Sequence, residues 1–161
     1  MYIFAEEDKV LVCAANQDND GSQQEGTVSA ARNIRVLAFY LLYASYAQDY
    51  QVSLESILEN LERGFEVNVP DKKSIEIAAS IIEQKEQLDA FLVPLLDKWR
   101  LERIGVCTHL ILWIGLWELM HTDIDPKIII NEAIELSKCF AEKDAYRFVN
   151  GILDQAVKIL R

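Results

Sequence analysis

The most apolar stretch of this chain, from Ile104 to Trp117, limits what the rest of the sequence can fold into. It is only 14 residues long and contains Thr108 and His109. A helix that crosses a bilayer needs about 20 apolar residues, so this stretch is too short to do so. A helix that is apolar nearly all round is typical of a protein core. We therefore expect a central buried helix at about 100–120, on which the other elements pack.

The rest of the sequence is also patterned for helices. No run of alternating apolar and polar residues of any length follows residue 28, and the chain has only three prolines and six glycines. Apolar spacings of three and four residues are typical of helices that bury one face. They predict helices at about 29–48, 53–66, 71–96 and 100–120, a helix that Asn131 caps and that ends near Phe140, and a last helix at 144–160. With 161 residues, this is an all-α protein of one-domain size.

The dipeptide Asn150-Gly151 is ordinarily a signal for a β-hairpin. Here apolar residues recur every four positions on both sides of it, which favours a helix: Phe148, Ile152 and Ala156, with Val149, Leu153 and Val157. A glycine inside a helix costs about 1 kcal/mol relative to alanine. We therefore expect another helix to approach closely at Gly151. Asn150 is expected to form a buried hydrogen-bonded link between helices.

The first 28 residues form an extension that differs from the rest. Residues 16–28 are polar and punctuated by glycine, which is typical of a linker. The segment before them could form a hairpin, an added strand or a disordered tail. Its first eight residues contain acids without a basic flank, which argues against a secretory peptide. We expect residues 29–161 to form the folded domain.

Net charge is −10, which ordinarily counts against a nucleic-acid partner. The acids are concentrated in residues 1–28 and 49–97, whereas residues 98–161 balance nine acids with nine bases. Residues 29–48 contain two arginines and no acid. A binding surface made from the first expected helix and the C-terminal half would avoid most of the repulsion.

No catalytic motif is present, and we expect neither an enzyme nor a metal or cofactor site. His109 and His121 have no acid at ligand spacing, and the three cysteines form no CxxC pair. His109 is better explained as a partly buried histidine with a hydrogen-bond partner. The acid pairs Glu132/Glu135 and Glu59/Glu62 lie one helical turn apart, as they commonly do on solvated faces.

Four residues of the first expected helix could form a basic and aromatic ridge. At helical spacing, Arg32, Arg35, Phe39 and Tyr43 lie on a different side of that helix from its leucines. Guanidinium groups hold phosphates by paired hydrogen bonds, and aromatic faces stack unpaired bases at roughly 1–3 kcal/mol each. The rings could instead pack against another part of the fold while the arginines remain in solvent. The residues alone leave both interpretations open.

The start of the last expected helix carries a second group of charged and aromatic residues. It comprises Lys143, Asp144, Arg147 and Phe148. Asp144 suits an N-cap, where the helix dipole favours a carboxylate. Phe148 could equally belong to the core.

Glu118 follows Trp117 near the end of the apolar helix. A carboxylate at a rim beside a large aromatic suits a protein interface, because a charged hydrogen bond there can fix the register of the partner. Taken alone, the residues favour a solvated helix end.

Three segments carry a resemblance to a known family. INEAIELSKCF at 130–140 and FVNGILD at 148–154 stand in the order and near the spacing of the transcription antitermination factor NusB family. RLERIGVCTHLILWIGLWEL at 100–119 falls where that family places its central apolar helix. The similarity covers roughly residues 29–161. It implies a NusB-like helical bundle of two packed subdomains, each with three to four helices.

The resemblance also implies site residues. In this family the arginine-rich start of the first helix lies at the RNA-binding surface, together with the corner that precedes VNG. The RNA-binding residues implied here are Arg32, Arg35, Phe39, Lys143, Arg147 and Phe148. The WEL triplet looks like the family's aromatic-Glu-Leu, and this region faces the partner NusE, which implies partner contacts by Tyr43 and Glu118.

The resemblance implies a non-catalytic function and a location in the cytoplasm. Paired with NusE, a ribosomal protein of the small subunit, the protein is expected to bind a boxA-like single-stranded element of nascent RNA. It would support processive transcription of ribosomal RNA operons, with indirect contact to the RNA polymerase elongation complex and no membrane association.

Two alternatives remain open. Ala31 and Asn33 stand where the family often has further basic residues, so the chain could be a helical adaptor that binds protein without RNA. The same fold also serves as the RNA-binding module of certain ribosomal RNA cytosine methyltransferases. The chain ends at Arg161 without a methyl-donor domain, which argues against that second role.

Overall fold

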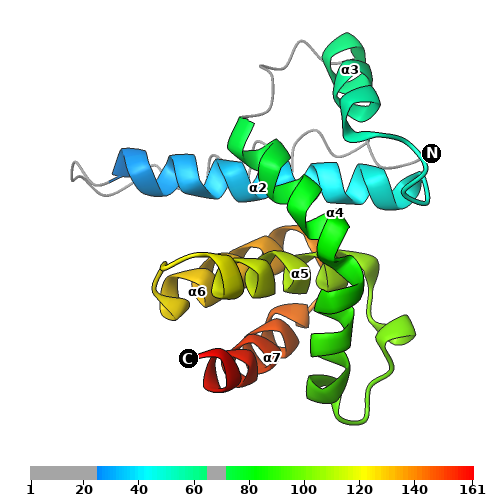
Figure 1. Cartoon of the computed structure of the whole chain (residues 1–161). Coiled ribbons are helices and arrows are strands. Elements are labelled where there is room, and N and C mark those ends of the chain that lie inside the picture. The colour runs from blue at the N-terminus through cyan, green and yellow to red at the C-terminus, as the bar shows by residue number, and fades with distance from the viewer. Residues whose placement is uncertain (1–24, 65–71) are drawn as a thin grey trace.

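The computed structural model describes residues 25–64 and 72–161, and no strand occurs in these ranges (Figure 1). The described elements are α2 (Glu25–Ala47), α3 (Leu54–Gly64), α4 (Lys72–Leu92), the 3₁₀ helices η1 (Val93–Leu96) and η2 (Leu101–Arg103), α5 (Val106–His121), α6 (Pro126–Phe140) and α7 (Ala145–Leu160). The predicted all-α class is confirmed.

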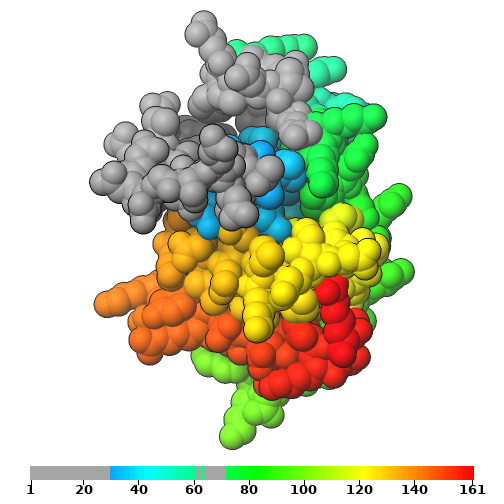
Figure 2. Space-filling model, turned by 90° about the vertical axis from the view of Figure 1, so that its left-hand side faces the viewer, coloured from blue at the N-terminus to red at the C-terminus, as the bar shows by residue number. Residues whose placement is uncertain are grey.

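The helices form two groups that α4 connects. In Figure 1, α2 and α3 lie with the start of α4 in one group, and α5, α6 and α7 lie together in the other. Helix α4 crosses α2 and continues beside α5, while α2 itself also packs on α5. The space-filling view shows the visible part of α2 directly above α6 (Figure 2). The expected pair of packed helical subdomains is therefore present.

Helix α5 is the central element. It packs against α4, α6, α7 and α2, and its residues 110–116 are all buried. The prediction of a central buried helix is confirmed, although α5 begins at Val106 instead of about residue 100. Arg100 and Ile104 are extended, so the preceding residues form the separate turn η2. No helix among the described residues is long and apolar enough to cross a bilayer.

Three helix boundaries follow from local signals. Ser53 caps α3, because its Oγ accepts a hydrogen bond from the Ser56 backbone N at 3.3 Å. Helix α4 ends at Leu92, since Pro94 lacks a backbone donor and the chain continues as η1. Helix α2 begins at Glu25, so the last four residues of the expected linker are helical. The rest of the extension lies outside the described residues.

The predicted cap of α6 is wrong. The helix begins five residues before Asn131, at Pro126, and the Asp125 side chain accepts a hydrogen bond from the Lys127 backbone N at 2.8 Å. An aspartate at the N-cap followed by proline at the first helical position is a strong start signal. Asn131 consequently lies inside the helix and is exposed.

The close approach expected at Gly151 occurs at Gly115 instead. Gly151 is helical as predicted, but it is exposed, and a Cβ added there would meet nothing within 4 Å. At Gly115, an added Cβ would lie 2.8 Å from Leu153 Cδ1 of α7. Asn150 is exposed as well, so it is not the expected buried link. Gly115 therefore sets the spacing between α5 and α7.

The two helical glycines provide a matched test. Gly151→Ala should raise the free energy of unfolding by about 0.5–1 kcal/mol, because alanine is the better helix former and has room. Gly115→Ala should lower it by about 1 kcal/mol or more, because the methyl group overpacks against Leu153. Urea unfolding monitored by circular dichroism measures both. Equal stabilisation by the two substitutions would contradict the proposed packing of α7 on α5.

Candidate functional site

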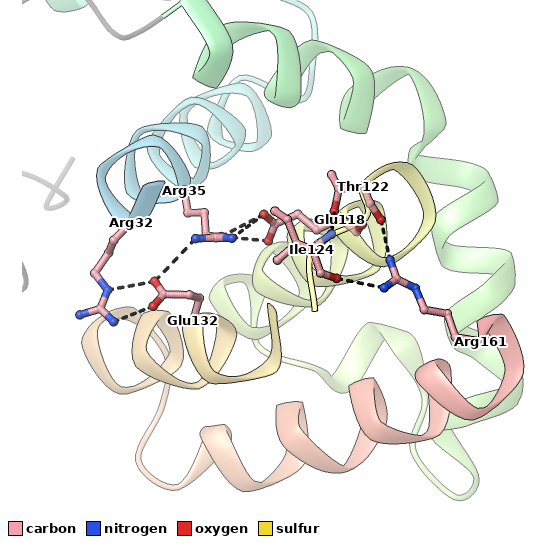
Figure 3. A network of polar contacts seen from close by, with 7 residues as sticks. All are labelled: Arg32, Arg35, Glu118, Thr122, Ile124, Glu132 and Arg161. Atoms are coloured by element: carbon pink, nitrogen blue, oxygen red, sulfur yellow. Dashed lines mark hydrogen bonds and ion pairs between the residues drawn. The ribbon is translucent and has the colours of Figure 1, made fainter. Parts of the chain in front are cut away.

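A buried ion pair joins α2 to α5. Arg35 is 5% exposed and Glu118 is 5% exposed. The Arg35 Nε lies 3.0 Å from both carboxylate oxygens of Glu118, and Nη2 lies 2.8 Å from Oε1 (Figure 3). Several short contacts to one carboxylate compensate the loss of water around both charges. Glu118 is therefore part of the interior, and the expectation of a rim position is wrong.

A second pair extends this network to α6. Arg32 donates to Glu132 through Nε at 2.9 Å and through Nη2 at 2.7 Å. Glu132 also lies 3.8 Å from Arg35 Nη1, so two arginines and two glutamates form one electroneutral group. The hydrogen bond to Glu132 raises the pKa of the Arg32 guanidinium above its ordinary value. Glu132 is buried, which corrects the expectation that it lies on a solvated face.

The exposed ridge expected on α2 does not form. Arg35 is buried, and the Phe39 ring, 3% exposed, stacks on Phe140 of α6 at a centroid distance of 4.6 Å. Tyr43 is half-buried with its ring 6.3 Å from that of Phe39, and the Arg32 side chain keeps 19% of its surface exposed. Burial also raises the pKa of the neighbouring Tyr40 to about 12. Helix α2 is thus covered on its arginine side as well as on its leucine side.

Sequence reasoning missed Arg161, which closes the turn between α5 and α6. Its guanidinium donates to the backbone oxygens of Thr122 at 2.5 Å and Ile124 at 2.9 Å (Figure 3). It also donates to the Leu119 backbone oxygen at 3.2 Å. The last carbonyls of a helix have no partner within the helix, and a cation there also favours the helix dipole. No motif signals this role, since the acceptors are main-chain atoms far away in the sequence.

The start of α7 presents cations to solvent. Lys143 and Arg147 are exposed, and Phe148 is half-buried. Arg147 donates from Nε to the Tyr146 hydroxyl at 3.2 Å, which raises the pKa of Arg147. Asp144 has a left-handed backbone with φ 66° and makes no cap hydrogen bond through its side chain, so the expected capping interaction is absent.

Trp99 is a further residue that the sequence analysis missed. It is 61% exposed, and its ring meets the edge of Phe148 at a centroid distance of 6.0 Å. It lies in the connection between α4 and α5, within the run Lys98 to Arg103. The available signal was the pair of basic residues, Lys98 and Arg100, on either side of this tryptophan.

His109 holds α4 to α5. Its Nε2 lies 2.6 Å from Asp89 Oδ1, and the Trp113 indole N–H donates to the same oxygen at 2.7 Å. The expectation of a partly buried, partnered histidine is confirmed. Within the described ranges, no cluster of three or more acidic, histidine or cysteine side chains is arranged to hold a metal ion.

Comparison with known proteins identifies the family. The NusB family model matches residues 32–158. The chain belongs to the NusB family. A transcription antitermination protein NusB of Oleidesulfovibrio alaskensis is 35% identical over 143 residues, covering 84% of this chain and 92% of that protein. The corresponding Macrococcus caseolyticus protein is 30% identical over 123 residues, covering 75% of this chain and 91% of that protein.

Solved structures agree with this assignment. T. maritima NusB superposes with a TM-score of 0.68 at 30% identity, covering 79% of this chain and 89% of that chain. A chain from a structure described as a plectonemic RNA supercoil also gives a TM-score of 0.68, at 20% identity, covering 80% of this chain and 94% of that chain. The second similarity shows the shared fold alone.

The buried and exposed ion pairs should differ sharply in their effect on stability. Arg35→Met leaves the Glu118 carboxylate buried without its main partner, so the free energy of unfolding should fall by about 3–5 kcal/mol. Lys158→Met removes a pair with Asp154 at 2.8 Å whose lysine side chain is 70% exposed. That change should lower the free energy of unfolding by less than about 1 kcal/mol.

Urea unfolding of both variants checks this difference. Arg35→Met/Glu118→Leu removes both buried charges and should recover part of the free energy of unfolding that Arg35→Met loses. Similar stability of Arg35→Met and Lys158→Met would show that the buried pair does not hold α2 on α5.

Proposed function

We propose that this protein acts in transcription antitermination by binding boxA-like single-stranded RNA together with NusE, the ribosomal protein of the small subunit. The curated relatives are described as transcription antitermination proteins, which supports this role. The complex would support processive transcription of ribosomal RNA operons. Contact with the elongating RNA polymerase would then be indirect.

The observation that carries the proposal is the exposed cationic start of α7. Lys143 and Arg147 are exposed beside the half-buried ring of Phe148. Cations can hold phosphates, and an accessible aromatic ring can stack on a base. We therefore assign direct RNA contacts to these three residues.

The arginine side of α2 contributes differently. Arg32 retains a partly exposed side chain and can reach a phosphate at its edge while it remains bonded to Glu132. Arg35 and Phe39 are buried, so they would support the RNA surface by holding α2 against α5 and α6. Two arginines whose charges are balanced internally add little to the attraction for RNA.

For NusE, we retain Tyr43 as a contact because its ring is half-buried and accessible. Glu118 is buried against Arg35, so its contribution would be indirect, through the placement of α2. Glu118→Ala would then weaken partner binding only together with a loss of stability.

A protein-binding adaptor without RNA affinity is the second candidate. The observation that favours it is the internal pairing of Arg32 and Arg35 with Glu132 and Glu118, which removes two cations from the candidate RNA surface. The adaptor would bind NusE without needing RNA.

Anisotropy of a labelled boxA-like RNA, measured across salt concentrations with and without NusE, separates the two functions. Each phosphate neutralised on a single strand contributes about 0.7 to the slope of log affinity against log salt. Lys143→Gln/Arg147→Gln should therefore flatten the slope by roughly 1.4 and weaken binding. Lys127→Gln/Lys158→Gln is the matched control, because it removes the same charge elsewhere on the surface. Absence of RNA binding by the native protein in both conditions would favour the adaptor.

A further inference from the structure

The connection between α4 and α5 presents a tryptophan to solvent. Helix α4 gives way to η1, and Asp97, with φ 51°, turns the backbone before Trp99. The Trp99 backbone N donates to the Leu96 oxygen at 2.9 Å, which fixes the main chain at this point. The side chain is nevertheless 61% exposed.

The other two tryptophans form hydrogen bonds within the fold. Trp113 donates its indole N–H to Asp89 at 2.7 Å, and Trp117 donates to Ser80 at 2.9 Å. The indole N–H of Trp99 has no hydrogen-bond partner among residues 25–64 and 72–161. An exposed indole can offer its apolar face to a ligand while its N–H donates to water or to a polar group of that ligand.

Three cations lie within four residues of Trp99 in the sequence. Lys98, Arg100 and Arg103 are all exposed, and none makes an ion pair with another part of the chain that the structure describes. Glu102 is the one acid within residues 98–103. The protein has a net charge of −10, but this connection is locally positive. A positive segment of this kind suits binding to a polyanion.

This segment is continuous with the RNA surface proposed at the start of α7. The Trp99 ring meets the edge of the Phe148 ring at 63°, and α7 packs on η1. In Figure 2, the yellow-green segment that joins α4 to α5 protrudes below α7. The aromatic pair therefore joins two segments that each carry exposed cations.

We infer that this connection is a second part of the single-stranded RNA site, in which Trp99 stacks on an unpaired base while Lys98, Arg100 and Arg103 hold the neighbouring phosphates. The inference rests on the proposed RNA-binding function and extends it to residues 98–103. Base stacking on an aromatic face tolerates many sequences and requires an unpaired base. The site should therefore prefer a single strand to a duplex, whose bases are already stacked.

The first test uses Trp99→Ala and Trp99→Phe with a fluorescein-labelled single-stranded RNA of about 12 nucleotides, followed by anisotropy. Loss of one stacked base should weaken binding by roughly tenfold in Trp99→Ala, with little change in salt slope. Trp99→Phe, which keeps a ring, should remain within about threefold of the native protein. Ile159→Ala is the control, because Ile159 is 62% exposed at the other end of α7 and should bind RNA as the native protein does.

Two further measurements distinguish base stacking from a structural role. RNA should quench tryptophan fluorescence in the native protein and do so markedly less in Trp99→Phe, which retains Trp113 and Trp117. Arg100→Gln/Arg103→Gln should flatten the salt slope by roughly 1.4. Circular dichroism verifies that each variant remains folded.

The outcomes separate this inference from the proposed function. If the native protein binds no RNA with or without NusE, both are wrong. If Lys143→Gln/Arg147→Gln weakens binding but Trp99→Ala behaves like Ile159→Ala, the RNA-binding function stands and the second part of the site does not. If Trp99→Ala weakens binding of NusE while RNA affinity is unchanged, the connection is a protein contact and the inference is overturned.

Discussion

The placement of α2 depends on the buried pair of Arg35 and Glu118. Burial of either charge alone would be strongly unfavourable, and their mutual hydrogen bonds make the arrangement tolerable only in a narrow geometry. The pair therefore joins α2 to α5 through directional contacts, which apolar packing does not provide. Glu132 and the stacked rings of Phe39 and Phe140 extend the same constraint to α6. The first group of helices is thereby oriented on the second.

This constraint also decides which positive charge remains available for a partner. The arginines of α2 are balanced by glutamates inside the fold, whereas the cations of α7 and of the α4–α5 connection are exposed. At physiological salt, charges more than about 8 Å apart in solvent are largely screened from each other. The acidic total of the chain consequently has little influence on a partner held at these local cations. An acidic protein can thus present a surface that suits RNA.

Patterns within a helix were sufficient to predict most of the fold. The apolar run that became α5 and the four-residue period across Asn150-Gly151 each specify a helix without knowledge of its neighbours. The expected cap at Asn131 misses the start of α6, because the Asp125-Pro126 pair several residues earlier is the stronger start signal. The site was less predictable. Arg35 and Glu118 are 83 residues apart, and nothing in either local sequence shows that they pair. Exposure of Trp99 likewise depends on how the chain leaves α4.

The two cationic segments owe their relative position to contacts that lie away from them. Leu153 packs at Gly115, which fixes the middle of α7 on α5, and Arg161 attaches the far end of α7 to the α5–α6 turn. With α7 fixed at two points, its first turn can meet the connection after α4 in one arrangement, and the Trp99–Phe148 contact is the result. A surface that is ordered before binding loses less conformational entropy when a flexible single strand arrives. The core of the second helix group thus orders the proposed RNA surface, although it does not itself form that surface.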